Sequence, residues 1–552
     1  MSKNLSHISD RKGLEDNLFE RIGHAAEANG SLSAESIKAI SEEFLTGTAN
    51  VFGTASFYDF TRHANSGKKV YVCNGSACLA AGTQPALRSE LQQHFSAEEI
   101  GEMCCLGRCH ENVAFHYQGH NYSGADLHHV KEIVSGNNTV SAEKYTVGHL
   151  GRQILTGPAR TTAEIRSLFQ SVLARQSSDI LSEIRTSGLR GRGGAGFPIA
   201  IKLEGCRNAQ GDQKYIVCNA DEGDPGSYSD RYLLEHQAEL VLAGMWIAGY
   251  VTGASRGVVY IRAEYPASVD HIQKTVETWR SEGLLGENLL GSEFSFEFKV
   301  IKAQGAYICG EETALLSSIE GQRPEVRVRP PFPVHQGLFL KPTVVNNVET
   351  LAGIPFICTE GGAAYAALGN GKSTGTKLVS LDSAFRRPGI YELEMGTPLQ
   401  TVVEEMGQGF RRPVKALHIG GPLGGLVPVS KIPDLSLDFE SFAAQGFMLG
   451  HASVVSVPEE FPIIYYLEHL FEFTAHESCG KCFPCRLGST RGKELIHKAR
   501  TDHNYKIDRK LMDDLLDTMK RGSLCALGGG IPLPVMNALR YFGDELEPYF
   551  KK

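Results

Sequence analysis

The chain contains 552 residues, several times the usual length of one domain, so we expect several folded units. With 42% hydrophobic and 21% charged residues, its composition is that of a globular protein and excludes a disordered or fibrous chain. The formal net charge of -8 excludes the basic field that non-specific nucleic-acid binding requires.

The 13 cysteines are an odd number, and disulfide frameworks are mostly found in small secreted domains. Residues 1–30 mix charges of both signs and contain no apolar core of a signal peptide. The longest apolar stretch, near residues 241–251, is too short to span a bilayer. The sequence therefore predicts a cytoplasmic protein with metal-bound or buried free thiols, no direct membrane insertion and no nucleic-acid partner.

The N-terminal part divides into two predicted units. Residues 1–65 are predicted to form a helical subdomain, because LSAESIKAISEEFL at 32–45 has apolar residues at helical spacing behind a serine cap. Residues 66–140 are predicted to form a small α/β unit, in which KKVYVCNGSACLAAG runs from a strand into a cysteine loop and GEMCCLGRC is a second such loop. The polar segment at about 135–165 is predicted to be a linker.

The rest of the chain is predicted to contain three further units. Residues 150–365 alternate helices with apolar strands such as KYIVCNA and GVVYIRA, which predicts a large α/β domain. Residues 370–435 are predicted to form a small α+β module. Residues 440–552 are predicted to be mostly helical, with FPIIYYLEHLFEFTAHES and RKLMDDLLDTMKRG on either side of a cysteine cluster. The predicted fold class is a multidomain α/β protein.

Two cysteine pairs lie near the N-terminus, Cys73-x4-Cys78 and Cys105-x3-Cys109. Two pairs on two loops can hold a [2Fe-2S] cluster, one pair on each iron. Cys104 is adjacent to a predicted ligand and is expected to point elsewhere as a spare thiol. A zinc site or incidental buried thiols are the alternatives.

Four further cysteines lie near the C-terminus. Cys479, Cys482 and Cys485 have C-x2-C-x2-C spacing, and Cys525 follows at a distance. One tight loop that presents three sulfurs, with a distant fourth, is typical of a [4Fe-4S] site. Structural zinc more often uses separated pairs, and remains an alternative. The isolated cysteines are expected to be buried as small hydrophobic residues: Cys206, Cys218, Cys309 and Cys358.

The segment GLRGRGGAGFP contains G-x-G-x-x-G at Gly191, Gly193 and Gly196. The residues before it are predicted to be helical, so the strand of the ordinary dinucleotide fingerprint is missing, and no Walker A lysine follows. Glycine exposes backbone amides, and Arg192 and Lys202 add two cations, which favours a cradle for a phosphate or another anion. The alternative is a flexible loop without a ligand.

Polar residues also follow two predicted strands, in NADEGDPGS and in AYICGEE. Amide and carboxylate groups suit the sugar, ring edge or polyol of a nucleotide, whereas turn formation and helix capping are the alternative roles. The residues concerned are Asn219, Asp221, Glu222, Asp224, Gly310, Glu311 and Glu312.

Together, GLRGRGGAGFP, NADEGDPGS, AYICGEE, KPTVVNNVET and ESCGKCFPCR resemble the NADH-binding flavoprotein of respiratory complex I and its soluble relatives. The N-terminal part, with TASFYDF and its two cysteine pairs, resembles the thioredoxin-like [2Fe-2S] subunit of the same enzymes. Both parts lie in one chain here, as in the diaphorase subunits of NAD-dependent formate dehydrogenases and NAD-reducing hydrogenases.

The resemblance implies a thioredoxin-like [2Fe-2S] domain, a Rossmann-like FMN- and NAD-binding domain, a β-grasp module at 370–435 and a helical [4Fe-4S] domain. It implies that FMN contacts Gly191, Arg192, Gly194, Lys202, Asn219, Asp221, Gly310, Glu311, Asn346 and Asn347. It places NAD(H) near Phe197, Glu222, Tyr307 and Phe332, with Asp224 and Glu312 completing the cofactor-binding set. The implied cluster ligands are Cys73, Cys78, Cys105, Cys109, Cys479, Cys482, Cys485 and Cys525.

Three positions depart from the family pattern. The family usually has Glu where Asp224 stands, and usually reads G-A-G-A-Y where this chain has A-Q-G-A-Y with Gln304. An aromatic residue often follows Lys202 closely, whereas LEGC follows here. Because these positions adjoin the expected nucleotide contacts, the preference between NAD and NADP stays open.

The expected chemistry follows from the cofactors. NAD(H) exchanges two electrons as a hydride and iron–sulfur clusters exchange one at a time, so a flavin must stand between them. We expect hydride transfer between nicotinamide C4 and flavin N5 and electron flow through the [4Fe-4S] cluster, with no side chain acting as a general acid or base. The N-terminal cluster is either a relay or a side branch.

The sequence contains no molybdopterin-sized domain and no nickel-site pair, so we expect a hetero-oligomer. The order of the fused parts, and the end of the chain soon after Cys525, resemble the β chain of a two-subunit formate dehydrogenase. Its catalytic alpha subunit would carry a molybdenum- or tungsten-pterin site and further clusters. The alternatives are hydrogenase subunits as partners, another soluble NADH oxidoreductase, and a non-catalytic cluster-bearing scaffold without flavin. A complex I-like membrane assembly is disfavoured, since its two subunits are usually separate chains.

Overall fold

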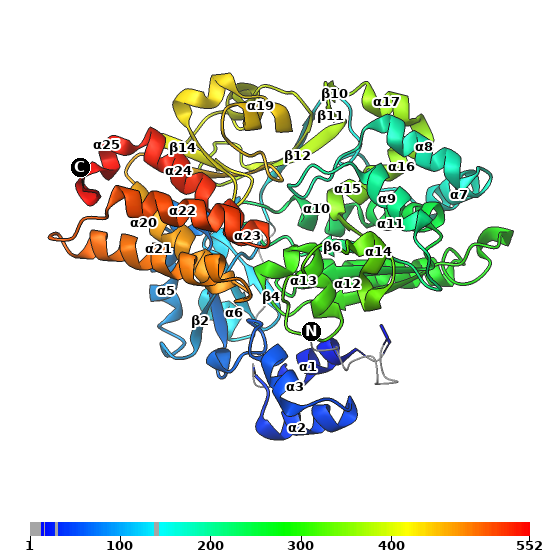
Figure 1. Cartoon of the computed structure of the whole chain (residues 1–552), viewed down its shortest axis with the longest axis horizontal. Coiled ribbons are helices and arrows are strands. Elements are labelled where there is room, and N and C mark those ends of the chain that lie inside the picture. The colour runs from blue at the N-terminus through cyan, green and yellow to red at the C-terminus, as the bar shows by residue number, and fades with distance from the viewer. Residues whose placement is uncertain (1–12, 16, 28–30, 137–142, 552) are drawn as a thin grey trace.

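Three sheets of four or more strands organise the computed structural model, which describes the chain except residues 1–12, 16, 28–30, 137–142 and 552. Figure 1 shows the N-terminal helices below, the C-terminal helices on the left, and a mixed sheet above them. The large α/β unit with its parallel sheet lies on the right. The chain therefore places two cysteine-bearing regions beside one α/β unit.

The N-terminal region begins with three short helices and continues into a four-stranded sheet of order β2-β1-β3-β4. Strands β1 and β2 are parallel neighbours, so the cysteine loops that follow them leave the same edge of the sheet. The helix predicted within 32–45 is α2, capped by Ser33. The bounds are α1 Leu18–Ala26, α2 Ala34–Glu43, α3 Thr48–Ala55, β1 Val70–Cys73, α4 Ser76–Ala81, α5 Gln84–Leu91, β2 Ile100–Met103, β3 Phe115–Tyr117, β4 His120–Tyr122 and α6 Val130–Val134.

The large α/β unit contains a parallel sheet of order β8-β7-β6-β9 with helices around it. The apolar segment near 241–251 lies in α11, whose side chains are buried almost throughout. Gly244 permits this burial, because a Cβ there would lie 1.9 Å from the carbonyl oxygen of Leu351. The bounds are α7 Thr162–Leu173, α8 Ser177–Ser187, α9 Ile199–Asn208, β6 Tyr215–Ala220, α10 Ser229–His236, α11 Ala238–Thr252, β7 Arg256–Ile261, α12 Pro266–Ser281, β8 Glu297–Lys302, α13 Glu312–Ile319, α14 Pro333–Gln336, β9 Thr343–Asn347, α15 Val348–Ala352, α16 Ile354–Glu360 and α17 Gly362–Ala366.

A mixed six-stranded sheet has the order β15-β14-β16-β12-β13-β5. Most of its strands come from the predicted module at 370–435, but a strand from either side of that range completes it. Strand β5 pairs with β13 from within the predicted linker, and β16 pairs with β12 and β14. The bounds are β5 Thr146–Leu150, β12 Thr376–Leu381, β13 Gly389–Glu394, β14 Val414–Ile419, β15 Gly425–Pro428, α19 Phe439–Ala444 and β16 Ser453–Pro458.

The C-terminal region is helical, as predicted, and three of its cysteines lie in two loops between helices, while Cys485 lies in the first turn of α21. Cys479 and Cys482 lie between α20 and α21, and Cys525 lies between α22 and α23. Helix α22 is amphipathic and buries Met512, Leu516 and Met519. The bounds are α20 Ile463–Glu477, α21 Phe483–Thr501, α22 Arg509–Gly522, α23 Ala526–Gly530, α24 Pro532–Tyr541 and α25 Gly543–Leu546. No helix in the described part of the chain is both long and apolar enough to cross a membrane.

A buried histidine joins the mixed sheet to the C-terminal helices. Nδ1 of His418 on β14 lies 2.9 Å from the Tyr466 hydroxyl on α20. Burial lowers the pKa of His418 from 6.5 to about 4. The pKa of His418 is thus lower in the folded than in the unfolded protein. The neutral imidazole is tolerated in the folded state above about pH 6.5, and the protein loses stability as the pH falls towards 4, because only the unfolded state takes up the proton. The full loss amounts to about 3 kcal/mol.

We therefore expect His418→Gln to flatten the fall in the thermal unfolding midpoint between about pH 6.5 and pH 4. Differential scanning calorimetry of the wild type and the variant over this range measures the effect. His503→Gln, at an exposed position, is the matched control and is expected to follow the wild type. An identical pH dependence in His418→Gln and the wild type would contradict a neutral, buried imidazole.

Candidate functional site

The predicted polar residues meet at the carboxyl edge of the parallel sheet. Strands β6 and β9 are parallel neighbours whose register pairs Cys218 with Asn346 and Asn219 with Asn347. The chain continues from β6 to β7 on one side and returns to β9 on the other, so the two strands flank a topological switch point. Open α/β sheets bind ligands in the crevice at such points. Chain topology alone thus brings Asn219, Asn346 and Asn347 together.

The glycine loop lies on this edge. It connects α8 to α9 and is closed by a hydrogen bond from the Gly191 amide to the Phe197 carbonyl, 2.9 Å. A Cβ on Gly193 would lie 2.9 Å from the Cβ of Asn347, and Gly194 has a φ of +121°. The backbone therefore approaches the strand end more closely than other residues allow. The helix predicted before the loop is present as α8, which confirms that this is not an ordinary dinucleotide fingerprint.

Two buried polar atoms at this edge have no hydrogen-bond partner among the described residues. They are Oδ2 of Asp221 and Nδ2 of Asn346. Burial raises the pKa of Asp221 well above its usual value, which favours the neutral carboxyl group. A neutral carboxyl and an amide can pair with hydroxyl and carbonyl groups of a ligand. The ribityl chain and ring of FMN carry such groups, so these residues fit that cofactor.

The second predicted strand, at AYIC, is instead a 3-10 turn over Tyr307–Gly310. The Tyr307 amide donates to Oε2 of Glu477, 2.9 Å, and therefore does not take part in a sheet. The Gly310 carbonyl accepts from Nδ2 of Asn219, 2.8 Å, which joins the turn to β6. Glu311 then caps α13 by accepting from the Thr313 and Ala314 amides.

Lys202 and Glu312 are bound to each other in the pocket. The Lys202 ammonium lies 3.0 Å from Oε2 of Glu312 and 3.1 Å from the Val345 carbonyl. Arg329, which the sequence analysis did not select, bonds Oε1 of Glu312 at 2.8 Å and lies 3.4 Å from Oε1 of Glu311. The candidate pocket therefore contains two cations and two carboxylates from three segments.

Arg192 has a different role from the predicted one. Its guanidinium is buried and donates to the Tyr365 hydroxyl at 3.0 Å and the Thr374 carbonyl at 2.5 Å. Its amide donates to Oγ1 of Thr350. The side chain thus anchors the glycine loop to the protein interior, while its Nη1 has no hydrogen-bond partner among the described residues. Lys202, the second cation predicted near the loop, is half-buried.

Glu222 was predicted to lie beside NAD(H), but its carboxylate is already used inside the protein. Five donors bond it: the Ser227, Ser229 and Tyr265 hydroxyls and the Asp230 and Arg231 amides. Burial alone would raise the pKa of Glu222, but bonding to His451, Ser227 and the Asp230 amide lowers it to about 2. Glu222 therefore stays ionised and holds the start of α10.

Asp224 and Tyr307 form one side of the crevice. The Tyr307 hydroxyl donates to Oδ1 of Asp224, 2.6 Å, and the Tyr307 ring packs on Gly223, where a Cβ would lie 2.7 Å from Cδ2. Phe197 and Phe332 are about half-exposed, as rings that stack on a nucleotide need to be. Gln304 does not disturb the pocket, because its side chain packs against Gly23 of α1.

The four N-terminal thiols are gathered at the edge of their sheet. The sulfurs of Cys105 and Cys109 are 3.4 Å apart, and the Cys73 thiol is within hydrogen-bonding reach of those of Cys105 and Cys78. The Gly226 amide, from the loop after β6, donates to Sγ of Cys109, 3.2 Å. Hydrogen bonding to Cys105, together with burial, raises the pKa of Cys109 well above its usual value. Such thiols ionise when iron supplies the positive charge.

The C-terminal thiols also fit a cluster. Cys482 precedes α21, Cys485 lies in its first turn, and Cys525 precedes α23. Burial raises the pKa of Cys485 to about 11 and that of Cys525 to about 12. Gly528 leaves room beside them, since a Cβ there would lie 3.0 Å from Sγ of Cys485. In the described part of the chain, no group of three or more Cys, His, Asp or Glu side chains is arranged to hold a metal ion.

The remaining five cysteines are free thiols outside the two predicted ligand sets. Cys104 packs between the two largest hydrophobic clusters. Cys206, Cys218, Cys309 and Cys358 are buried, as predicted.

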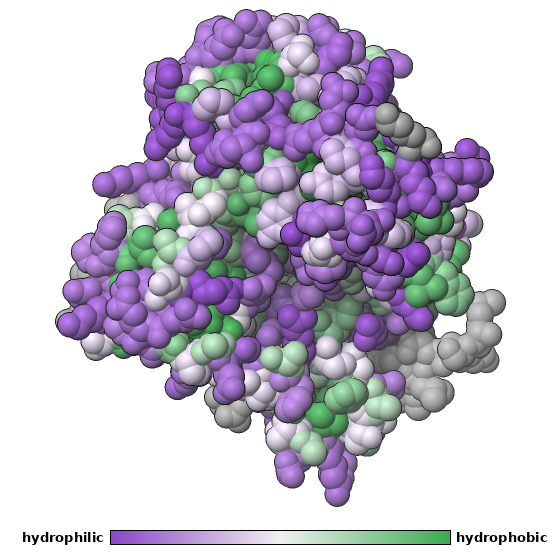
Figure 2. Space-filling model, turned by 90° about the vertical axis from the view of Figure 1, so that its left-hand side faces the viewer, coloured by the Kyte–Doolittle hydropathy of each residue, from purple (hydrophilic) through white to green (hydrophobic). Residues whose placement is uncertain are grey.

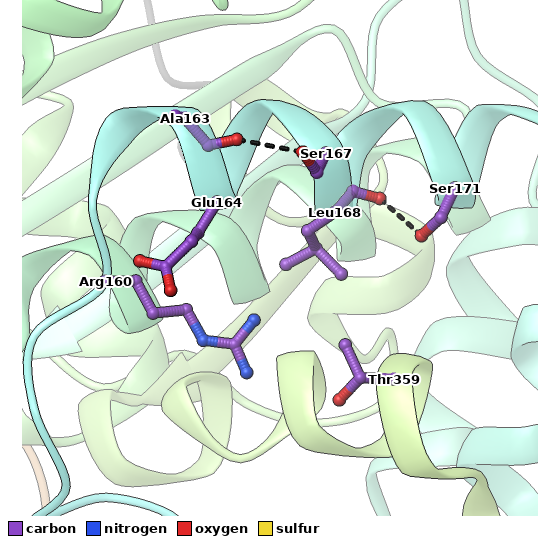
Figure 3. Close-up of a pocket in the computed structure, with 7 residues that line it drawn as sticks. All are labelled: Arg160, Ala163, Glu164, Ser167, Leu168, Ser171 and Thr359. Atoms are coloured by element: carbon purple, nitrogen blue, oxygen red, sulfur yellow. Dashed lines mark hydrogen bonds between the residues drawn. The ribbon is translucent and has the colours of Figure 1, made fainter.

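A hollow of about 420 Å³ lies elsewhere, between α7 and α16 (Figure 3). The Ser167 and Ser171 hydroxyls along it donate to carbonyls of their own helix. Their hydroxyl hydrogens are thus already used, and the hollow contains none of the predicted site residues.

The glycine loop gives a sharp test of flavin binding. Gly193→Ala is expected to lower bound flavin at least tenfold, because its Cβ would displace Asn347. Gly53→Ala in α3 is the matched control, since no atom lies within 4 Å of its Cβ and the position is outside the glycine loop. Flavin released from purified protein by acid, measured by fluorescence, gives the content. Full flavin in Gly193→Ala would show that the cofactor lies elsewhere.

Three family models match the chain. They are "Thioredoxin-like [2Fe-2S] ferredoxin" over residues 6–138, "Nuo51 FMN-binding domain" over 184–356, and "NADH-ubiquinone oxidoreductase-F iron-sulfur binding region" over 465–549. The matches coincide with the three regions that carry the N-terminal thiols, the glycine loop and the C-terminal thiols.

Individual proteins are similar over most of the chain. The chain is 40% identical over 380 residues to NADP-reducing hydrogenase subunit HndC of Solidesulfovibrio fructosivorans, covering 68% of this chain and 77% of the relative. It is 37% identical to an NADH-quinone oxidoreductase subunit of Rhizobium meliloti, covering 70% and 92%. It is 33% identical over 522 residues to the NAD-reducing hydrogenase HoxS subunit alpha of Cupriavidus necator, covering 89% and 85%. A solved NAD+-reducing [NiFe]-hydrogenase chain superposes with a TM-score of 0.84 at 28% identity, covering 97% and 93%.

Proposed function

Because this chain belongs to the family of NADH-binding flavoprotein iron–sulfur subunits of complex I-like enzymes and NAD-reducing hydrogenases, we propose that it acts as a diaphorase, exchanging electrons between NAD(H) and a partner subunit. The family models confirm the predicted FMN-binding domain, the thioredoxin-like [2Fe-2S] domain and the [4Fe-4S] region. They also confirm the predicted fold class.

One observation supports the proposal above the others. The loop after β6 borders the candidate flavin pocket through Asp221 and bonds the [2Fe-2S] thiols through the Gly226 amide. At the other side of the pocket, Tyr307 is bonded to Glu477, two residues before Cys479. Both thiol groups are thus linked to one pocket through short segments of backbone.

When bound, FMN takes two electrons from NADH as a hydride and releases them singly to iron–sulfur clusters. We propose that the chain's own residues position this cofactor. Asn219, Asp221 and Asn346 bond its polar groups, and the glycine loop with Lys202 holds its phosphate. The nucleotide then stacks at Phe197 and Phe332, with Tyr307 and Asp224 beside it. We also propose that the eight predicted cysteines bind the two clusters and that the chain divides into the five predicted domains.

The partner is proposed to dock beside the C-terminal thiols. Phe483 is 69% and Leu487 55% exposed, and Leu511 and Leu524 lie exposed on the adjoining elements. Figure 2 shows the face that carries these helices, where apolar residues form separate patches among hydrophilic ones. A protein that holds a further cluster would cover these side chains and receive electrons from the [4Fe-4S] site.

Two partners are candidates. The similarity to hydrogenase subunits along nearly the whole chain favours a hydrogenase. The second candidate, which rests on the family resemblance alone, is a formate dehydrogenase alpha subunit with a molybdenum- or tungsten-pterin site. We also propose a cytoplasmic location, where free thiols such as these stay reduced.

The function is tested by anaerobic absorption spectra of the isolated protein with and without NADH. We expect a flavin absorption band at about 450 nm, near the wavelength of free flavin. NADH is expected to bleach this band. A colourless protein, or a flavin that NADH fails to bleach, would refute the diaphorase and favour a cluster-bearing scaffold. Metal analysis of the co-purified complex then separates the partners: nickel indicates a hydrogenase, and molybdenum or tungsten a formate dehydrogenase.

A further inference from the structure

A buried histidine outside the predicted site lies between the flavin pocket and the [2Fe-2S] thiols. His451 occupies the turn between α19 and β16, flanked by Gly450 and Ala452 with φ of +57° and +64°. A Cβ on Gly450 would lie 2.4 Å from the carbonyl oxygen of Gly420. The tight backbone of this turn places the His451 imidazole against the acidic loop after β6.

The two ring nitrogens of His451 make different contacts with the acidic loop. Nδ1 lies 3.1 Å from Oδ2 of Asp224, an ion-pair distance without hydrogen-bond geometry, and Nε2 lies 2.5 Å from Oγ of Ser227. The Ser227 hydroxyl hydrogen is directed at Oε1 of Glu222, so Oγ is left to accept from the ring. The ring also lies within 4 Å of two carboxylates, those of Asp224 and Glu222. Two nearby negative charges favour the protonated imidazole.

The surrounding charges require this cation. In the described part of the chain, Asp224 and Glu222 have no ion pair other than the one with His451. The nearby Arg262 pairs with Glu264 and bonds only the backbone carbonyl of Glu222. Burial alone would lower the pKa of His451, but the bonds to Asp224 and Glu222 raise it to about 10.

The polar chain continues to both redox sites. Asp224 uses its other oxygen, Oδ1, to accept from the Tyr307 hydroxyl at the pocket. Two residues along the same loop, the Gly226 amide bonds the sulfur of Cys109. The position of this loop thus affects the pocket and the thiols together.

We propose that His451 is a positioning residue: a fixed buried cation that orients Asp224 towards Tyr307 and holds the loop between the flavin pocket and the [2Fe-2S] thiols. This inference rests on the proposed diaphorase function. The positive charge also stabilises the added electron at either site, because attraction between charges is strong where water is excluded.

The test compares His451→Gln with the wild type in the purified full-length protein. The [2Fe-2S] potential is measured by dye-mediated dithionite titration with EPR detection, which needs no NADH. We expect the reduction equilibrium constant to fall about tenfold, a shift of about 59 mV to lower potential for one electron. We also expect the KM for NADH to rise about tenfold with kcat within about twofold, since Asp224 and Tyr307 lose their fixed geometry.

His418→Gln is the matched control, because it replaces a buried but neutral histidine of the same sheet. Should His451→Gln lose flavin or iron, the His451→Gln/Asp224→Asn double variant decides, as it also removes the closer of the two carboxylates that pair with His451. Recovery of both cofactors in the double variant supports the charge pairing; no recovery overturns it. A potential and KM equal to those of the wild type also overturn it. A wild type without NADH-reducible flavin would refute the diaphorase function instead.

Discussion

Cys479→Ser is expected to remove about four irons per chain together with the EPR signal of the reduced [4Fe-4S] cluster. Cys479 is buried in the loop between α20 and α21, and serine offers no thiolate to iron there. Because the flavin pocket is built from other segments, NADH is expected to bleach the flavin as in the wild type. Iron determination and EPR at low temperature measure the loss.

Two variants show whether the loss is specific. Cys358→Ser alters a buried thiol far along the chain from both predicted clusters and is expected to keep all iron. Cys73→Ser is expected to remove about two irons and to leave the [4Fe-4S] signal intact. Unchanged iron in Cys479→Ser or in Cys73→Ser would contradict the corresponding ligand assignment.

Lys377→Met is expected to destabilise the protein by about 3–5 kcal/mol. The Lys377 ammonium on β12 is fully buried and pairs with the Glu349 carboxylate on α15, which also accepts from the Leu378 amide at 3.0 Å. Removing the ammonium leaves a buried carboxylate without its countercharge. Since Glu349 follows Asn347 by two residues, we also expect weaker flavin retention. The thermal midpoint measures the effect, at about 2–4 °C for each kcal/mol in a unit of this size.

The double variant Lys377→Met/Glu349→Gln isolates the unpaired charge. It removes both partners, so its midpoint is expected to lie above that of Lys377→Met. A double variant that is less stable than the single one would indicate that Lys377 stabilises mainly by packing its alkyl chain.

The cysteine spacing was enough to predict both cluster regions, because ligands that lie close together in the sequence are close in space in any fold. Cys479, Cys482 and Cys485 span less than two helical turns, and the family models confirm an iron–sulfur region there. The helix before the glycine loop was predictable for a similar reason, since its apolar periodicity is local.

The roles of single polar residues were less predictable. Arg192 was expected to serve the cofactor, yet its guanidinium bonds Tyr365 and Thr374, more than 170 residues away. Glu222 follows a strand and has the composition of a ligand, but donors at the start of α10 use its carboxylate. Neither the bonds of Arg192 nor those of Glu222 can be predicted from the spacing of residues in the sequence.

His451 and Arg329 illustrate what sequence analysis missed. Arg329 precedes two prolines in RVRPP, and a cation so close to a candidate nucleotide site is a usable signal. His451 carries no such signal, because it belongs to the mixed sheet and meets Asp224 only through the turn before β16.

The sequence by itself determined the three cofactor regions, the fold class and the family, since these rest on local spacing and on motifs within short segments. The tertiary structure decided which side chains face the pocket, which are consumed by internal bonds, and where β5 and β16 pair. Those properties depend on segments hundreds of residues apart, whose approach is set by sheet topology and by the requirement that buried charges find partners.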